Sequence, residues 1–323
     1  MMSADPSIPA LIIAYRRTEQ VLRIIEVLTK AGVTKIYLAL DSAGEESPLA
    51  KAEAESLLYS LLDMQDDSSL EIHIAKHSEN VGCSAAVLSA CDWFFSNEEY
   101  GIILEDDCVP SPDFVTFALS ARTMIERHPN LWIACGTQFA PSTLMHDVWM
   151  TSRYALIWGW ATNRDKWRLI VDSIMAPQKI GRFCFVNRSE RQYWNAGSRR
   201  SSLGIVDAWD NVLISQMIAQ GAEAILPTAS LVSNVGFDSA ATHTKNRSQW
   251  LGHDPASFSV PDSAPRINPQ VDEWLKKHFY RVAFRHLFST RITLLLDLIS
   301  GKREGAISLK QRTNKASANF IHY

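Results

Sequence analysis

Short apolar runs and longer amphipathic segments alternate through the first 135 residues of the chain. The apolar runs have the length of strands and end at polar residues, which predicts buried strands. They lie at residues 9–14, 33–40, 70–74, 101–104 and 131–135. Segments with helical spacing follow, one from Thr18 to Gly32 and others at residues 49–63, 84–96 and 112–127. This alternation predicts an α/β fold in which helices flank a mostly parallel sheet.

The fourth apolar run leads directly into three consecutive carboxylates, Glu105, Asp106 and Asp107. Adjacent ionised carboxylates repel one another unless a cation lies among them. Oxygen ligands suit a hard divalent ion such as Mg²⁺ or Mn²⁺, which commonly binds together with substrate phosphates. An acidic turn in solvent is the alternative interpretation. Ligands of parallel sheets gather at the carboxyl ends of the strands, where Arg16, Asp41 and Asn80 also lie, so we expect one shared crevice.

The two common glycine-rich phosphate-binding motifs are absent from the sequence. No G-x-G-x-x-G follows the first strand, and no G-x-x-x-x-G-K-[ST] occurs anywhere. This disfavours a dinucleotide enzyme and a P-loop ATPase. A parallel sheet that binds a nucleoside diphosphate through carboxylates and a metal ion is instead the arrangement of a sugar-nucleotide transferase.

Several short blocks follow one another in a characteristic order over about residues 8–245. They are Tyr15-Arg16-Arg17, Asp41, Asn80-Val-Gly82-Cys83, Gly101-Ile-Ile-Leu-Glu-Asp-Asp-Cys-Val-Pro110, Trp158-Gly-Trp160-Ala-Thr162, Trp209-Asp210, and residues 231–244 with Asn234, Gly236 and His243. With these blocks the chain resembles the glycosyltransferase-A (GT-A) superfamily. Within it, the chain resembles bacterial glycosyltransferases related to family 2 and to N-acetylglucosaminyltransferase I.

The resemblance implies that a sugar passes from a nucleoside-diphosphate donor, with a UDP-sugar favoured, to an acceptor hydroxyl with inversion. The acceptor would be a glycan or a lipid-linked saccharide in the synthesis of a bacterial surface polysaccharide. The implied cofactor is a divalent metal, Mn²⁺ or Mg²⁺, with Asp107 as its ligand and His243 completing the metal or phosphate site. The implied donor-binding residues are Tyr15, Arg16, Asp41, Asn80, Glu105, Asp106 and Trp160.

Asp210 is the predicted catalytic base. It opens an apolar-periodic segment that includes residues 212–218, at the place where the resembling fold carries its catalytic carboxylate. A carboxylate beside an acceptor hydroxyl can take its proton during attack on the anomeric carbon. Asp207 is the alternative base, and a capping role for Asp210 is a third interpretation, because Asp is a favoured N-cap residue.

Two further segments allow more than one interpretation. Trp158 and Trp160 flank a glycine, and we expect at least one of them to face the sugar or the donor, whereas Trp167 is expected in the core. Residues 181–204 are predicted to be a mobile lid over the diphosphate, with a solvated loop as the alternative. Their arginines are Arg182, Arg188, Arg191, Arg199 and Arg200.

Composition supports a folded enzyme with an electrostatically distinct tail. The 323 residues are 46% hydrophobic, enough for one large or two small lobes. We expect a nucleotide-sugar-binding lobe at 1–135, an acceptor and catalytic lobe at 136–262, and a helical tail at 263–323. Residues 271–323 hold ten Lys or Arg against four Asp or Glu, a net charge of +6. Lys277, Arg281 and Arg285 have helical spacing opposite an apolar stripe, which predicts a basic amphipathic helix.

That tail helix either packs on the catalytic lobe or contacts an anionic membrane surface. No signal peptide is expected, no apolar run is long enough to cross a membrane, and the five cysteines are odd in number and lack C-x-x-C spacing. These features predict reduced thiols in a cytoplasmic protein, with a peripheral position at the inner membrane face as the alternative if the tail binds lipid. Nucleic acid is not an expected partner.

Two alternative functions remain from the sequence. A sugar-1-phosphate nucleotidyltransferase would use a similar sheet and similar acids, but it would favour a glycine-rich basic loop after the first strand. The chain has Tyr15-Arg16-Arg17-Thr18 there. A non-catalytic carbohydrate-binding protein with the GT-A fold is the other alternative, and the acids at 106, 107 and 210 argue against it.

Overall fold

The computed structural model describes residues 7–15, 17–42, 70–182, 184, 186–236, 257–282 and 307–322. Two of the predicted site residues, Arg16 and His243, lie outside these ranges. The predicted helix at 49–63 lies outside them as well.

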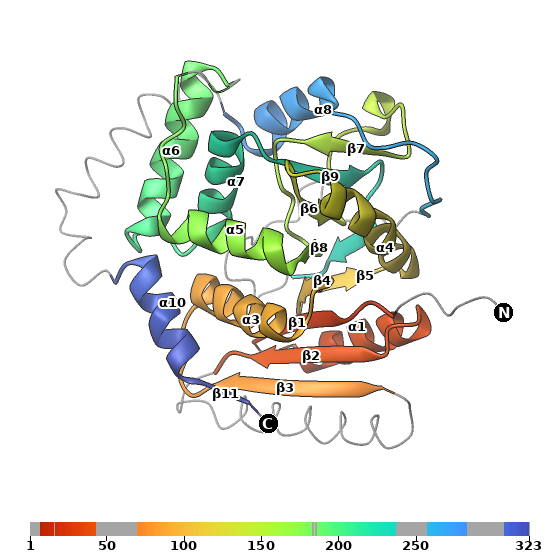
Figure 1. The fold of residues 1–323 in the computed structure, drawn as a ribbon, viewed down its shortest axis with the longest axis vertical. Coiled ribbons are helices and arrows are strands. Elements are labelled where there is room, and N and C mark those ends of the chain that lie inside the picture. Colours follow the sequence, from red (N-terminus) through yellow and green to blue (C-terminus); the bar gives the residue numbers. More distant parts are fainter. Residues whose placement is uncertain are drawn as a thin grey trace.

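Nine of the described strands form one sheet with the order β11-β3-β2-β1-β4-β8-β6-β9-β7 (Figure 1). Six of them, β1 to β4, β6 and β9, run in one direction, and β7, β8 and β11 run in the other. The strands are β1 (Ala10–Ala14), β2 (Lys35–Leu40), β3 (Glu71–His77), β4 (Tyr100–Glu105), β6 (Leu131–Cys135), β7 (Trp149–Ser152), β8 (Trp160–Asn163), β9 (Glu223–Pro227) and β11 (Phe320–His322). The predicted α/β fold with a mostly parallel sheet is therefore confirmed.

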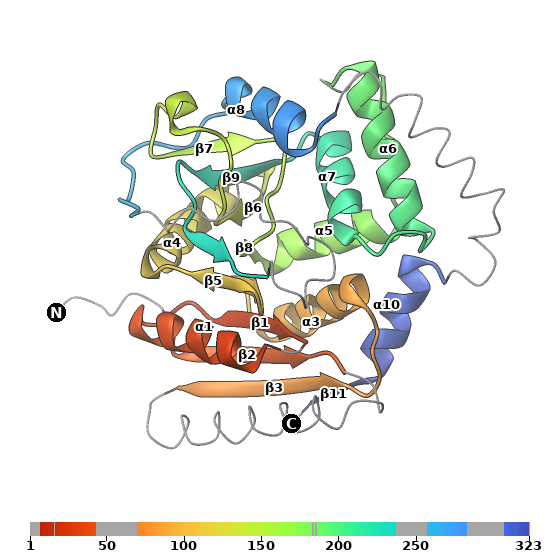
Figure 2. The ribbon, with the colours of Figure 1, turned by 180° about the vertical axis from the view of Figure 1, so that it is seen from behind.

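Helices cover both faces of this sheet. Strand β1 shows why: Leu11 and Ile13 enter one buried cluster, and Ala10 and Ile12 enter the other, because successive strand side chains point to opposite faces. Figure 2 shows α1 on the face opposite to α3. The described helices are α1 (Thr18–Lys30), α3 (Cys83–Asn97), α4 (Pro112–Arg127), α5 (Arg164–Met175), α6 (Arg188–Ser202), α7 (Trp209–Gln220), α8 (Pro269–Trp274) and α10 (Leu309–Ala318), with short helical turns η1 (Ser142–Leu144) and η2 (Leu275–Phe279).

The segment predicted as a lid or solvated loop contains helix α6, so the loop interpretation is wrong for residues 188–202, and the lid stays a prediction. The Asn187 side chain caps this helix by accepting a hydrogen bond from the Glu190 backbone N–H at 2.9 Å. Glu190 and Trp194 are buried on its inner face, where the Tyr154 hydroxyl donates to Glu190. Except for Arg182, the arginines that suggested a loop belong to a helix whose buried stripe is narrow and partly polar.

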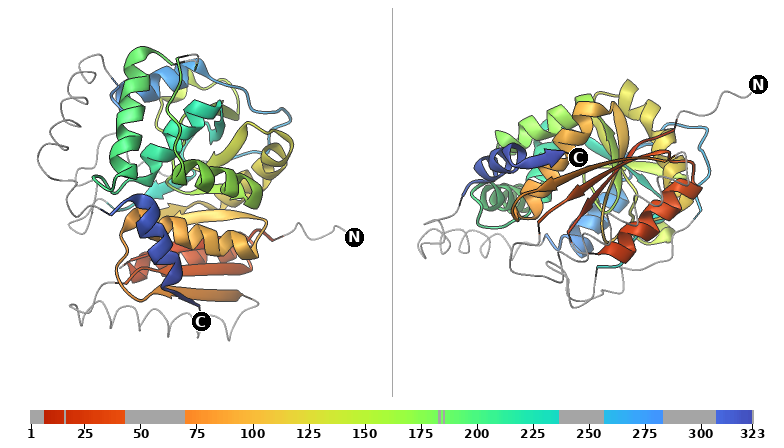
Figure 3. Two further views of the ribbon diagram at one scale, coloured as in Figure 1. Left: turned by 60° about the vertical axis from the view of Figure 1, so that its left-hand side comes forward. Right: turned by 90° about the horizontal axis from the view of Figure 1, so that it is seen from below.

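The tail contains two elements that belong to the main fold. Helix α10 packs beside α3, and β11 adds an antiparallel strand to the edge of the sheet, with Phe320 opposite His77 (Figure 3). The tail is therefore helical in part, as predicted, and it also contributes a strand that the sequence did not indicate.

The predicted basic amphipathic helix is interrupted within the described residues. Helix α8 continues into η2, which ends at Phe279, and Arg281 has a backbone φ of 52°. Lys277 and Arg281 are therefore not on one continuous helix, and Arg285 lies outside the described residues. Lys276 and Lys277 form ion pairs with Glu273.

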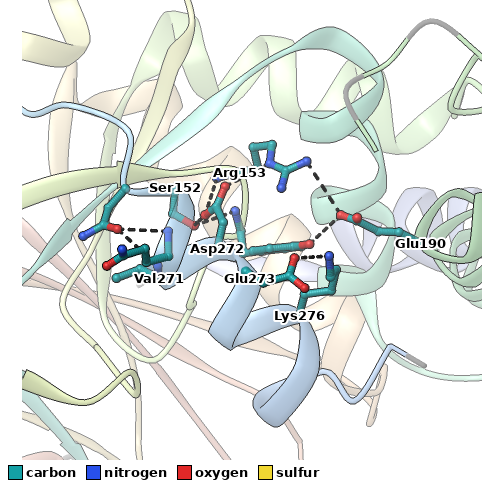
Figure 4. Close-up of polar contacts among 10 residues, drawn as sticks. Ser152, Arg153, Glu190, Val271, Asp272, Glu273 and Lys276 are labelled. Carbon is teal, nitrogen blue, oxygen red and sulfur yellow. Dashed lines mark hydrogen bonds and ion pairs between the residues drawn. The ribbon is translucent and has the colours of Figure 1, made fainter. Parts of the chain in front are cut away.

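A buried charge cluster fixes α8 to the rest of the protein (Figure 4). Asp272, only 1% exposed, accepts hydrogen bonds from the Ser152 hydroxyl at 2.6 Å and from Arg153 Nε at 2.9 Å. Arg153 Nη1 also lies 3.9 Å from a carboxylate oxygen of Glu190 on α6. Because a buried charge is costly unless it is paired, this cluster defines how β7, α6 and α8 pack together.

All five cysteines are free, which agrees with the predicted reduced thiols. Within the described residues, no helix is both long and apolar enough to cross a lipid bilayer.

Candidate active site

The acidic triplet lies at the end of β4, directly beside the end of β1. Asp106 accepts a hydrogen bond from the Tyr15 backbone N–H at 2.9 Å and another from Arg17 Nη1 at 2.8 Å. The Asp106 backbone N–H donates to the Ile13 carbonyl at 3.0 Å. Asp106 thus ties the triplet to the chain that leaves β1, and its carboxylate is engaged by protein donors.

Asp107 is the next acid, and it lies beside the negative charge of Asp106. Arg17 Nη1 lies 3.4 Å from Asp107 Oδ2, and the Cys108 thiol donates to Asp107 Oδ1 at 3.3 Å. Burial raises the pKa of Asp107, and the negative charge of Asp106 raises it further. Burial also raises the pKa of Glu105, with further contributions from Asp107 and Asp106. These carboxylates disfavour one another's ionisation, so a cation among them would be stabilising.

A small two-stranded ribbon covers the triplet. Strand β5 (Cys108–Pro110) pairs with β10 (Val232–Asn234), and the Val235 N–H donates to the Asp107 carbonyl at 2.8 Å. Gly236 then lies against the Asp107 side chain, since a Cβ at position 236 would be 2.2 Å from Asp107 Oδ2. The structure therefore brings together two blocks that lie far apart in the sequence.

Asp41 and Asn80 meet at the ends of β2 and β3, as the parallel sheet led us to expect. Asp41 Oδ1 accepts hydrogen bonds from the backbone N–H groups of Ser42 at 2.9 Å and Val81 at 3.2 Å. Asn80 Nδ2 donates to the Ser42 carbonyl at 3.1 Å. Burial is the main reason that the pKa of Asp41 rises to about 6, and these backbone donors oppose the rise.

His77 lies behind Asp41 in the protein interior. Its Nδ1 is 3.8 Å from Asp41 Oδ1, and its Nε2 is within hydrogen-bonding distance of the Ser89 hydroxyl. Burial lowers the pKa of His77 to about 4, so the imidazole is neutral at pH 7 and does not offset the charge of Asp41.

The two candidate bases have different environments. Asp207 Oδ1 accepts from the Ser84 N–H at the start of α3 at 3.2 Å, and it forms an ion pair with Arg312 Nη2 at 3.2 Å. The Asp207 carboxylate is thus held at the start of α3 by these two contacts. Asp210 lies in the first turn of α7, whose N-cap is Ala208, so the capping interpretation of Asp210 is wrong.

The charge of Asp210 acts on the acidic triplet and on two partly buried tyrosines. Its charge contributes to the raised pKa of Glu105, after burial and the other two triplet acids. It also contributes, after burial, to the raised pKa values of Tyr193 on α6 and Tyr280 after η2. The predicted base and Glu105 of the acidic triplet therefore share one electrostatic environment.

Trp160 lies in the core. It is 2% exposed, and its ring packs against Trp167 at 6.0 Å and Trp209 at 5.9 Å between centroids. A ring enclosed in this way cannot stack on a ligand at the surface, so we do not retain Trp160 as a donor-binding residue. Trp158 is only partly buried and packs edge-on against Phe139. Trp167 is in the core, as expected.

Three residues at this site were not singled out from the sequence. Arg17 lies within a recognised block, but only the structure shows its contacts with Asp106 and Asp107. Cys83, at the start of α3, has a pKa raised by burial and then by nearby acids, Glu105 first among them. Arg312 carries no motif and lies over a hundred positions beyond Asp207, so no local sequence signal could have found it.

The described residues could hold a divalent cation at this site together with ligands from a substrate. The described residues include no group of three His, Cys, Asp or Glu side chains arranged to hold a metal ion. Mg²⁺ and Mn²⁺ nevertheless bind many enzymes through one or two carboxylates together with substrate phosphates. Asp107 is the candidate carboxylate for this role: Asp106 accepts hydrogen bonds from Tyr15 and Arg17, whereas Arg17 reaches Asp107 only at 3.4 Å. His243 lies outside the described residues.

A cavity of about 570 Å³ lies elsewhere, beside the start of β7 and the end of β9. Its lining includes His146, Asp147, Thr228 and Phe258, and none of the predicted site residues. The candidate site is therefore identified by its converging acids and not by this cavity.

No family model matches the chain, and no curated protein sequence matches it. Solved structures do share part of its fold. The inositol-1-phosphate CTP transferase from T. maritima is 10% identical over 75% of this chain and 94% of that chain, with a TM-score of 0.41. The mannosyltransferase PcManGT from Pyrobaculum calidifontis, in complex with GDP-Man and Mn²⁺, is 8% identical over 67% and 70%, with a TM-score of 0.37.

A UDP-glucose pyrophosphorylase complexed with UDP-glucose is 10% identical over 68% of this chain and 90% of that chain, with a TM-score of 0.36. At such identities and scores these likenesses carry no argument about activity. The chain is an α/β protein in which helices flank a large, mostly parallel sheet, and its activity has to be argued from the site.

Proposed function

We propose that the chain is a metal-dependent, inverting glycosyltransferase of the GT-A type that uses a nucleoside-diphosphate sugar. The observation that carries the proposal is that Asp210 lies in the same negative field as the acidic triplet. Glu105 and Asp107 have raised pKa values because burial and mutual repulsion disfavour their charged forms, and Asp210 adds to this field. A divalent cation accompanied by a diphosphate would relieve the repulsion within the triplet, and Asp210 would remain available as a base.

The proposed roles follow from these contacts. Asp107 would hold the cation, which when bound would stabilise negative charge on the departing diphosphate. Asp106 keeps Tyr15 and Arg17 in place beside the triplet. Asp41 and Asn80 would contact the base or ribose of the donor, at the ends of β2 and β3. Arg16 and His243 stay predictions of the sequence.

Asp210 would accept the proton of the acceptor hydroxyl as its oxygen bonds to the anomeric carbon. The bond between that carbon and the diphosphate oxygen breaks in the same step, and the leaving diphosphate takes the bonding electrons. Attack from the face opposite the leaving group inverts the anomeric centre. Asp207 is less suited to this role because Ser84 and Arg312 already engage its carboxylate.

For the acceptor we propose only a chemical class, and for the cellular setting only a possible membrane contact. A glycan or lipid-linked saccharide is the acceptor class that the sequence resemblance implies. The ion pairs of the tail argue against the contact with an anionic membrane that the sequence predicted as one possibility. Lys276 and Lys277 pair with Glu273, and Lys315 pairs with Glu79 at 2.6 Å. Co-sedimentation with anionic and with neutral vesicles tests this part separately.

The product of the reaction distinguishes this proposal from its closest alternative. With Mn²⁺ and a panel of UDP-, GDP- and dTDP-sugars, a glycosyltransferase releases the nucleoside diphosphate, slowly to water and faster with a mixed saccharide acceptor panel. A sugar-1-phosphate nucleotidyltransferase instead releases pyrophosphate from nucleoside triphosphates and sugar 1-phosphates. Diphosphate release that Asp210→Asn abolishes supports the proposal, whereas pyrophosphate release alone contradicts it.

A further inference from the structure

The segment at residues 307–322 contacts the loop that leads to Asp210 at two points. This loop, residues 203–208, connects α6 to α7. Gly204 has a backbone φ of 73°, and a Cβ there would lie 2.2 Å from the Ile307 carbonyl oxygen. Asp207, three residues after Gly204, forms its ion pair with Arg312 on α10 at 3.2 Å. The loop is therefore held from one side by a distant part of the chain.

Asp207 also contacts the start of α3. Its Oδ1 accepts from the Ser84 N–H, and a Cβ at Gly82, where φ is 81°, would lie 2.7 Å from its Oδ2. A carboxylate at a helix N-terminus satisfies N–H groups that have no partner within the helix. One side chain thus joins the loop before Asp210 to the helix that follows Asn80.

The charge of Arg312 matters because the acids around it are numerous. Burial is the main cause of the raised pKa values of Asp41 and Cys83. Asp207 adds to both, and Asp210 adds to that of Cys83, so this end of α3 lies in a negative field. A nucleoside diphosphate would add further negative charge. Arg312 supplies a positive charge next to Asp207, and its side chain is 22% exposed.

Arg312 is held firmly by its surroundings. Ser308 and Gln311 form a capping box at the start of α10, and Leu309, Thr313 and Ala316 are buried. At the other end of the helix, Lys315 and Asn319 both contact Glu79. The Phe320 ring stacks on His77 with centroids 4.3 Å apart. The helix that carries Arg312 is thereby fixed at both ends.

We propose that Arg312 is a positioning residue of the active site: it neutralises Asp207 and so fixes both the start of α3 and the loop before Asp210. Its effect on substrate rests on the proposed function, because it presumes that a nucleoside diphosphate binds beside these acids. Its effect on the protein backbone does not depend on that function.

Four variants separate charge neutralisation from simple packing. Arg312→Met removes the charge, Arg312→Lys keeps it, and Asp207→Asn with Arg312→Met removes both charges while position 207 can still accept from Ser84. Lys310→Met is the matched control, because Lys310 is exposed on the same helix. Calorimetry with UDP and with GDP, each with Mn²⁺, measures affinity, and hydrogen exchange measures backbone protection.

Arg312→Met should weaken diphosphate binding about tenfold, and Arg312→Lys should stay within about threefold of the unaltered protein. The double variant should recover to within about threefold, which a packing role would not produce. Amides at 82–86 and 203–208 should exchange at least about tenfold faster in Arg312→Met and at the normal rate in Lys310→Met.

Normal exchange and normal affinity in Arg312→Met would overturn the inference, as would a double variant no tighter than the single one. If the unaltered protein binds neither diphosphate, the proposed function fails. The exchange rates at 82–86 and 203–208 then still decide whether Arg312 positions these segments.

Discussion

Gly236 and Asp107 are in such close contact that a Cβ on Gly236 would lie 2.2 Å from Asp107 Oδ2 and 2.9 Å from Asp107 Cβ. The two residues are joined through the β5–β10 ribbon, in which Asn234 is opposite Cys108. The Asn234 side chain also accepts a hydrogen bond from the Gly236 N–H at 2.8 Å. The rotamer of the proposed metal-binding acid therefore depends on the absence of a side chain at position 236.

Gly236→Ala should consequently displace the Asp107 carboxylate and weaken Mn²⁺-dependent diphosphate binding by about tenfold or more. Calorimetry with UDP or GDP in the presence and absence of Mn²⁺ measures this. Gly181→Ala is the matched control, because nothing lies within 4 Å of a Cβ at that position. Equal metal-dependent affinity in the two variants would show that Asp107 adjusts freely.

Asp41 should cost the protein stability at neutral pH. Its pKa is about 6 in the folded protein and near 3.8 when unfolded, so between these values the folded state binds more protons. Stability therefore falls as pH rises from about 4 to 6, by at most about 3 kcal/mol. Asp41→Asn removes this cost while an amide oxygen can still accept from Val81.

We therefore expect urea unfolding at pH 7.5 to give Asp41→Asn a larger unfolding free energy than the unaltered protein, with the difference disappearing near pH 4. Diphosphate affinity should fall in the same variant, since stabilising a functional site commonly weakens its function. A variant less stable at pH 7.5 would indicate that the ionised carboxylate is stabilising, contrary to its burial.

Asp210→Asn and Asp207→Asn should affect catalysis differently. Asn at 210 cannot accept the acceptor proton, so turnover should fall by about 10²-fold or more while donor binding changes little. Asn at 207 can still accept from the Ser84 N–H, so turnover should fall less than about tenfold. Steady-state rates of diphosphate release give both values. The opposite order would transfer the role of base to Asp207.

Removal of the residues after 306 should destabilise the whole protein. The truncated chain loses β11 from the edge of β3, and it loses the burial of Leu309 and Phe320, which are 2% and 9% exposed. Burying side chains of this size contributes about 1.5–3 kcal/mol each, so unfolding should require at least about 2 kcal/mol less. Unchanged urea midpoints would mean that this segment does not stabilise the fold.

Local patterns in the sequence predicted the sheet well. Short apolar runs located β1, β2, β3, β4 and β6, and the parallel sheet places Asp41 and Asn80 together at the ends of β2 and β3. These features are encoded by nearby residues or by the sheet itself, which explains why they are readable without a structure.

The failures have a different physical origin. Helix α6 was missed because its inner face buries Glu190 with a Tyr154 partner, so its apolar stripe is weak in the sequence. Trp160 was predicted to contact the donor because its burial could not be read from neighbouring residues. Its ring is enclosed by Trp167 and Trp209, and Trp209 is distant in the sequence. The Arg312 contact with Asp207 joins segments that only the folded chain brings together, and no periodicity records it.

The central claim is that Asp107 holds a divalent cation together with a nucleoside diphosphate, and calorimetry of Asp107→Asn tests it most directly. Asp165→Asn is the control, since its carboxylate is 86% exposed on α5 and outside the site. In the unaltered protein and in Asp165→Asn, Mn²⁺ should tighten UDP or GDP binding by about tenfold or more. In Asp107→Asn that enhancement should disappear while the far-UV circular dichroism stays the same. A Mn²⁺ enhancement of normal size in Asp107→Asn would contradict the account.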